Sequence, residues 1–170
     1  GGAIVLAVLW VISTINGFKR REIKIEEALS GIEVALTKRY DMLTKLLDTA
    51  KGFMEHESDL FSQVVSLRHG MSVGEMGKAD REMSELTGRI FAVAENYPEL
   101  RSSEVFLELQ RGIRDAEEHL QAARRLYNAN VSRYNTAIIM FPASLLARGR
   151  SAREFYDADD AKLGDIKMQF

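Results

Sequence analysis

The sequence predicts an all-α protein, an antiparallel up-and-down bundle of three long helices preceded by an N-terminal membrane helix. Apolar residues recur at spacings of three and four along most of the 170-residue chain, and no stretch alternates with a period of two. The periodic segments are joined by short stretches containing glycine or proline, which favours antiparallel neighbours. The chain has no cysteine, which excludes disulfides and thiolate catalysis, and its net charge of −2 gives no reason to expect a nucleic-acid partner.

The first element is an uncharged apolar run. Residues 3–15 carry no charge, and Lys19, Arg20 and Arg21 follow. A helix of this length spans only ~20 Å of the ~30 Å bilayer core, so residues 1–18 are interpreted as a transmembrane helix or its C-terminal part. A buried helix would not need apolar residues on every side, and a signal peptide would carry its charge before the apolar run. Because residues 19–24 have a net charge of +3, the positive-inside rule predicts that the rest of the chain is cytoplasmic.

The bundle domain is predicted over residues 19–156, and its first helix begins near Glu22. Apolar residues follow a helical period from Ile25 to Phe53, and the same phase continues to Leu67. This segment is either one very long helix or two helices joined at Gly52, which would give the bundle a fourth helix.

Two further helices come next in the sequence. The second opens on a capping box, Ser72-x-x-Glu75, and ends before Pro98. The third begins near Ser102 and continues until Pro142 closes it. Residues 157–170 are predicted to form a loosely held acidic C-terminal tail.

A pair of residues, Tyr-Asn, recurs after two helical turns in the third helix. We call Tyr127, Asn128, Tyr134 and Asn135 the Tyr–Asn face, because this spacing places all four on one side of the helix. Buried tyrosine and asparagine side chains need hydrogen-bond partners, so a structural role inside the bundle is the first interpretation and a docking surface or small polar pocket is the second. The partners expected opposite this face are Arg39, Tyr40 and Asp41 on the first helix, where a buried arginine would need both a carboxylate and amide acceptors.

No catalytic, cofactor-binding or metal-binding residue is predicted. His56-Glu57 resembles the start of a zinc motif, but Leu60 occupies the position of the second histidine. Asp115 and His119 could meet on one helix face, where a surface hydrogen bond is favoured over a weak metal site. No nucleophile elbow or phosphate loop is present in the sequence, so no enzyme and no cofactor are expected.

Short motifs give the chain a resemblance to a known family. They span nearly the whole chain in the order Arg39-Tyr-Asp-Met-Leu, Lys51-Gly-Phe-Met-Glu-His-Glu57, Glu95-Asn-Tyr-Pro-Glu-Leu100, Phe106-Leu-Glu-Leu-Gln110, Arg124-Arg-Leu-Tyr-Asn128, Tyr134-Asn135 and Phe141-Pro142. In these motifs the chain resembles the LemA family. The resemblance implies an N-terminal membrane helix and a cytoplasmic antiparallel helical bundle, and it implies no activity.

Three functions remain open from the sequence. The leading hypothesis is a non-enzymatic interaction or scaffold protein at the cell membrane, single-pass and anchored in the lipid bilayer through residues 3–18, whose cytoplasmic bundle docks another protein. Self-association into a homo-oligomer stays open. The alternative is a sensory or ligand-binding bundle with a pocket lined by Tyr127, Tyr134 and Asn135. A cryptic hydrolase or metalloenzyme ranks last, because the sequence offers no pair of titratable residues for it. A small basic cluster, Arg148, Arg150 and Arg153, is interpreted as solvated surface, with contact to lipid headgroups or a partner as the alternative.

Overall fold

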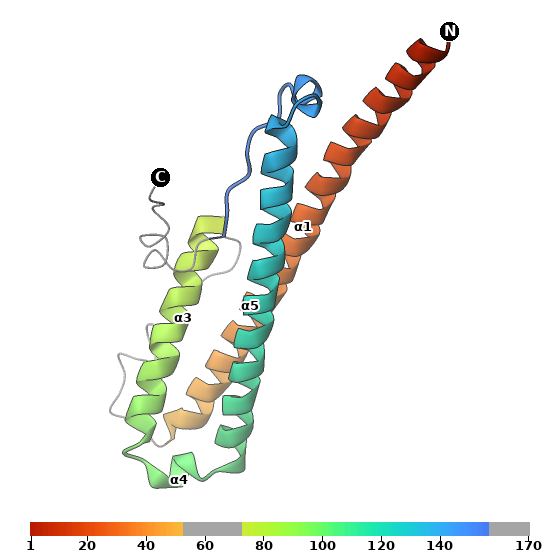
Figure 1. Ribbon diagram of the computed structural model, residues 1–170. Coiled ribbons are helices and arrows are strands. Elements are labelled where there is room, and N and C mark those ends of the chain that lie inside the picture. The colour runs from red at the N-terminus through yellow and green to blue at the C-terminus, as the bar shows by residue number, and fades with distance from the viewer. Residues whose placement is uncertain (53–72, 157–170) are drawn as a thin grey trace, which may run out of the picture. The chain divides into compact units, whose positions relative to one another are not determined.

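The computed structural model describes residues 1–52 and 73–156. These residues form four α-helices, α1 (Gly2–Lys51), α3 (Val73–Ala94), α4 (Pro98–Arg101) and α5 (Glu104–Ile139), followed by a 3₁₀-helix, Ala143–Leu146 (Figure 1). The described part of the chain contains no strand, which confirms the predicted all-α class. The capping residue Ser72, His56-Glu57 and the acidic tail lie outside the described residues.

Helix α1 runs without interruption from the apolar run into the amphipathic segment. The sequence suggested a membrane helix up to residue 18 and a bundle helix from about Glu22, but the helix has no break between them. Gly52 adopts a turn directly after α1, at the joint that the sequence suggested. The predicted continuation of the apolar period to Leu67 lies outside the described residues.

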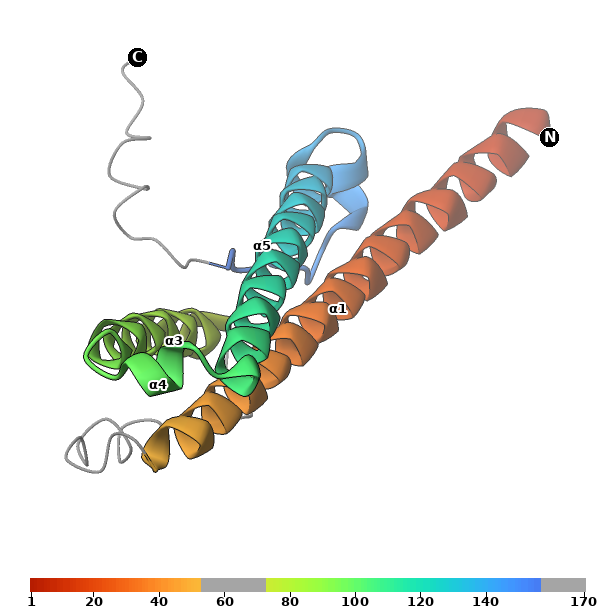
Figure 2. The ribbon, with the colours of Figure 1, turned by 90° about the horizontal axis from the view of Figure 1, so that it is seen from below.

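The ends of α5 follow from its sequence. The Ser103 hydroxyl accepts a hydrogen bond from the Phe106 backbone N–H at 3.1 Å, an N-cap that satisfies one of the free amide groups of the first turn. The helix ends at Ile139, shortly before Pro142, as predicted. Pro98 comes after the end of α3 as predicted, and it also begins the short helix α4, where its missing N–H costs nothing. In both ribbon views α4 lies beside one end of α3 (Figures 1 and 2).

The described chain divides into two compact units. The first consists of residues 1–32 and 122–155, so it pairs the start of α1 with the second half of α5 and the segment after it. The helices are antiparallel, since Glu22 contacts Tyr134 while Lys24, further along α1, contacts Asn130, earlier on α5. The core of this unit includes the fully buried Phe18, Ile25, Ile32 and Val131.

The second unit consists, among the described residues, of residues 33–52 and 73–121 together with Tyr156. It contains the rest of α1 and α5 with α3 and α4. Phe91 near the end of α3 meets Phe106 near the start of α5 edge-to-face, with ring centroids 5.9 Å apart. Side chains from all three long helices and α4 form the core, which includes Leu43, Leu46, Ile90, Leu100 and Leu120.

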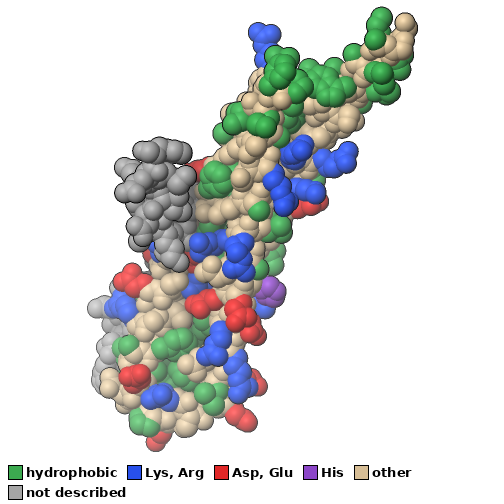
Figure 3. Space-filling view, viewed as in Figure 1, with side chains coloured by type: hydrophobic (Ala, Val, Ile, Leu, Met, Phe, Trp, Pro, Cys, Tyr) green, Lys and Arg blue, Asp and Glu red, His purple; other side chains and the backbone are tan. Residues whose placement is uncertain are grey.

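The first part of α1 is apolar on every side. One 18-residue window has a mean hydropathy of 1.6, and only 6% of it is buried, so by length and composition α1 can cross a membrane. Eight large side chains expose between 38% and 71% of their surface: Ile4, Val5, Leu6, Val8, Leu9, Trp10, Ile12 and Ile15. Figure 3 shows these hydrophobic side chains along the free end of α1, with lysine and arginine side chains further along the helix.

Candidate functional site

The Tyr–Asn face lies in the first unit and binds the segment after the 3₁₀-helix. The Tyr127 hydroxyl donates to the Glu154 carbonyl at 2.9 Å. The Asn135 side chain makes two hydrogen bonds with the backbone of Arg153, donating to its carbonyl at 3.0 Å and accepting from its N–H at 2.8 Å. This side-chain amide therefore binds the backbone N–H and C=O of one residue, much as the opposite residue of an antiparallel strand would. Asn128 is half-buried on the same helix.

The Tyr134 hydroxyl is part of a cluster of charged side chains that connects α1 to the segment after the 3₁₀-helix. This hydroxyl lies 3.4 Å from Glu22 Oε1, and that oxygen also accepts a hydrogen bond from Arg150 Nε at 3.1 Å. The Arg150 guanidinium lies over the ring of Phe18, 5.0 Å from its centroid. A second ion pair joins Arg153 to Glu26 at 3.4 Å. Two residues of the predicted basic cluster thus hold the returning segment against α1.

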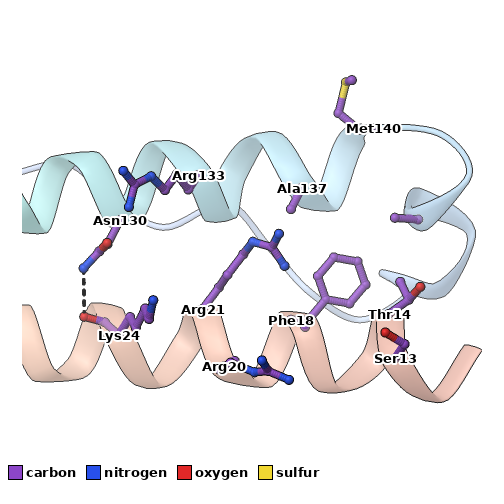
Figure 4. Close-up of a pocket in the computed structure, with 12 residues that line it drawn as sticks. Ser13, Thr14, Phe18, Arg20, Arg21, Lys24, Asn130, Arg133, Ala137 and Met140 are labelled. Atoms are coloured by element: carbon purple, nitrogen blue, oxygen red, sulfur yellow. Dashed lines mark hydrogen bonds between the residues drawn. The ribbon is translucent and has the colours of Figure 1, made fainter. Parts of the chain in front are cut away.

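Asn130 is a buried polar residue, 7% exposed, that the sequence did not point to. Its side-chain amide donates to the Lys24 carbonyl on α1 at 3.1 Å, the dashed line in Figure 4. Asn130 lies between the two Tyr-Asn pairs but outside their seven-residue repeat, so the repeat gave no signal for it.

Both tyrosines are held in their neutral form. Burial raises the pKa of Tyr127 above its usual value, and the Arg153 charge opposes that rise. Burial also raises the pKa of Tyr134, with the Glu22 carboxylate adding to the increase. These tyrosines therefore donate hydrogen bonds at neutral pH and are poor candidates for a general base.

Arg39 occupies a different environment from the one expected. It is 2% exposed, pairs with the buried Asp80 carboxylate and donates to Ser84 Oγ and Glu117 Oε1, both at 2.8 Å, all within the second unit. The sequence suggested that Arg39 and Asp41 lie opposite the Tyr–Asn face, but the carboxylates that Arg39 contacts are on α3 and α5, and Asp41 is exposed. The Tyr156 hydroxyl approaches the other Asp80 oxygen at 3.5 Å.

A pocket of about 640 Å³ opens beside α1 and α5 in the first unit. Tyr127, Tyr134 and Asn135 do not line it. Its walls are formed by Ser13, Thr14, Gly17, Phe18, Arg20, Arg21, Lys24, Asn130, Arg133, Ala137, Met140 and Ala143. In Figure 4 Phe18 and Arg21 point from α1 toward α5, and Arg20 lies along the surface of α1.

Within residues 1–52 and 73–156, no group of three or more histidine, aspartate or glutamate side chains is arranged to hold a metal ion. The buried charges of this part of the chain pair with one another, as Arg39 does with Asp80. Such pairs are typical of a structural network, and no nucleophile and base are brought together in them.

An exposed apolar helix that continues into a packed, antiparallel helical unit defines a class, the membrane-associated helical-bundle proteins. Within this class the chain belongs to the LemA family, which it matches over residues 28–170. The family match begins after the apolar segment.

Three relatives illustrate the range of similarity. Protein LemA of Metamycoplasma hominis is 25% identical over 138 residues, covering 78% of this chain and 63% of that protein. Magnetosome protein MamQ of Magnetospirillum gryphiswaldense is 30% identical over 69 residues, covering 41% of this chain and 25% of that protein. A MamQ protein of Paramagnetospirillum magneticum matches with the same coverage at 32% identity. The matched region thus spans less than two thirds of each relative.

Proposed function

We propose that this protein is a membrane-tethered, non-enzymatic interaction protein whose helical bundle lies on the cytoplasmic face and docks another protein. The observation that carries the proposal is the absence of a linker in the first unit. Ile15 is exposed, and three residues later Phe18 is 1% exposed and packed. The lipid-facing helix therefore continues directly into folded protein, which supports a bundle held at the membrane surface.

The Tyr–Asn face is engaged within the first unit, so we place the docking surface elsewhere. Outside the membrane-proximal part, several large apolar side chains expose 40–67% of their surface: Val34, Val105, Leu107 and Leu126. These exposed side chains on α1 and α5 are the positions at which we expect a protein partner.

The cytoplasmic orientation rests on the net charge of +3 at residues 19–24. Because the chain has no cysteine, one introduced thiol reports topology without background. The exposed Ser30 and Ser151 are suitable sites for Ser→Cys substitution. A membrane-impermeant maleimide should label both variants only after the cells are opened, and labelling of intact cells would show the opposite orientation.

Docking is tested by photo-crosslinking in living cells. A benzophenone amino acid at Val34 or Leu126 should give a discrete protein adduct, and the same probe at the neighbouring exposed Glu33 or Arg125 serves as the matched control on a different face. If none of the exposed apolar positions gives an adduct beyond its control while the chain remains folded in the membrane, the docking proposal fails.

One observation favours the alternative of a ligand-binding bundle. The pocket beside Asn130 is large enough for a polar group of moderate size, although its lining differs from the one expected. The charged residues that line this pocket indicate the class of ligand.

A further inference from the structure

The pocket beside α1 and α5 is strongly cationic. Four of its twelve lining residues are Arg20, Arg21, Lys24 and Arg133, and none is acidic. Arg21 and Arg133 also line a smaller adjoining hollow of about 360 Å³ with Ser132 and Thr136. Arginine binds phosphate through two parallel hydrogen bonds, and lysine binds it as a point charge. The donors gathered here therefore suit a phosphate group.

These cations are available for a ligand. Glu22 lies on the same stretch of α1, but its carboxylate is within reach of Lys19 at 3.6 Å and Arg150 at 3.1 Å. No described carboxylate forms an ion pair with any of the four cations of the pocket. Gathering like charges without a counter-ion is unfavourable, so a bound anion would stabilise this arrangement.

Gly17 provides the space in which one of these cations lies. A Cβ atom built at Gly17 would lie 3.1 Å from Arg21 Nη1, closer than side chains normally approach. An alanine at this position would require the Arg21 guanidinium to shift by a few tenths of an ångström. Figure 4 shows this guanidinium between the two helices, close to Phe18 and Ala137.

The other end of the pocket carries no charged side chain and adjoins the membrane segment. Ser13 and Thr14 of α1 line it together with Met140 and Ala143, from the end of α5 and the turn after it. This turn exposes Ile139, Met140, Phe141 and Leu145 by 58–78%. In Figure 3 hydrophobic side chains gather at the ends of both helices. From residue 13 to residue 24, α1 rises ~16 Å, enough to pass from the hydrocarbon edge through the headgroup layer.

We propose that this pocket binds the phosphate headgroup of an anionic phospholipid, with Arg21 and Arg133 as its principal ligands. The exposed apolar turn after α5 enters the same leaflet beside the acyl chains. An inorganic phosphate would use the cations but not the exposed apolar turn beside the pocket, and this combination favours a lipid as the occupant. The inference rests on the membrane anchoring of the proposed function and not on the docking of a protein partner.

The test uses the full chain, delipidated in nonionic detergent and titrated with phosphatidylglycerol or phosphatidylcholine, with bound lipid counted by native mass spectrometry. Wild type should retain one phosphatidylglycerol and bind phosphatidylcholine more weakly. Each cation near a membrane surface contributes about 1 kcal/mol, so Arg21→Gln with Arg133→Gln should weaken phosphatidylglycerol binding about thirtyfold. Both arginines are exposed, so helix content should not change.

Arg148→Gln is the matched control, because Arg148 is exposed in the same unit and does not line the pocket. It should leave phosphatidylglycerol binding within about twofold of wild type, as expected for a surface change away from the site. An equal loss in this control would show diffuse attraction and overturn the proposal, as would unchanged binding in the double variant.

Glycerol phosphate, which has no acyl chains, identifies the source of the phosphate. If it binds as tightly as phosphatidylglycerol, the pocket is a soluble-phosphate site and the lipid proposal fails. These outcomes are separate from the crosslinking result, so headgroup binding can fail while partner docking stands.

Discussion

Replacing Arg39 with leucine should strongly destabilise the second unit. The arginine is 2% exposed and its partner Asp80 is 6% exposed, so the substitution removes the guanidinium that pairs with a buried carboxylate. Removing one member of a buried ion pair costs about 3–5 kcal/mol. Glu117 contributes much less, because its side chain is 44% exposed and solvent screens the interaction. Glu117→Gln should therefore cost less than about 1 kcal/mol.

The double variant Arg39→Leu, Asp80→Leu tests whether the ion pair contributes more to stability than it costs to bury its two charges away from water. Both charges are then absent, and replacement of a buried pair by apolar residues is often neutral or stabilising. Arg39 Nε is also buried without a hydrogen-bond partner among the described residues, which reduces what the pair contributes to stability. We therefore expect the double variant to recover most of the stability that Arg39→Leu loses.

Thermal unfolding of the full chain in mild detergent, followed by far-UV circular dichroism, measures these differences. For a protein of this size, 3–5 kcal/mol corresponds to a decrease in Tm of roughly 6–20 °C. A decrease of less than about 2 °C for Arg39→Leu would refute the buried-charge argument, since that shift corresponds to no more than about 1 kcal/mol. A double variant as unstable as the sum of its single variants would also refute it.

Four further results are expected. The full chain should stay with membranes through a carbonate wash, and a variant lacking residues 1–16 should be released; the deletion stops before Phe18 because that ring is 1% exposed. Asn135→Leu should lower the free energy of unfolding by about 1 kcal/mol and speed amide exchange at Arg153, since water replaces part of the two lost hydrogen bonds at this exposed site. The pKa of Tyr134 is raised in the folded state, so the contribution of its neutral hydroxyl to stability is complete below about pH 10 and is lost as the pH rises through the folded pKa. In urea unfolding, the stability of Tyr134→Phe should therefore approach that of wild type at pH values above the folded pKa. Chelator or added zinc should leave the unfolding midpoint unchanged, and a decrease of several degrees with chelator would contradict the non-enzymatic assignment.

Local patterns were sufficient to predict the long helices, although not the unbroken course of α1 or the short helix α4. The spacing of apolar residues identified α3 and α5, and Ser103 and Pro142 lie at the ends where capping and chain geometry require them. The uncharged N-terminal run identified the membrane-compatible part of α1 in the same way. These signals act over one or two helical turns, so a single sequence contains them in full.

The tertiary partners could not be predicted from such patterns. The sequence indicates that a buried Arg39 needs a carboxylate, but it does not say which of 25 acidic residues supplies it, and Asp80 lies 41 positions away. The returning segment at Arg153 has no periodicity of its own, and Asn135 fixes it through backbone groups that every residue carries. The cationic pocket combines residues from α1 with Arg133, which lies more than 100 positions further along the chain.

Because α1 is unbroken, the directions in which its apolar residues point are fixed relative to the packed part of the same helix. Inserting one residue between Ile15 and Phe18 would turn everything before the insertion by about 100° and shift it by about 1.5 Å. Seven inserted residues would restore nearly the original direction while moving the apolar segment by about 10 Å. Because Phe18 is fixed in the packed unit, such insertions can change the rotation of the apolar segment and its depth in the bilayer separately, while the folded part stays unchanged.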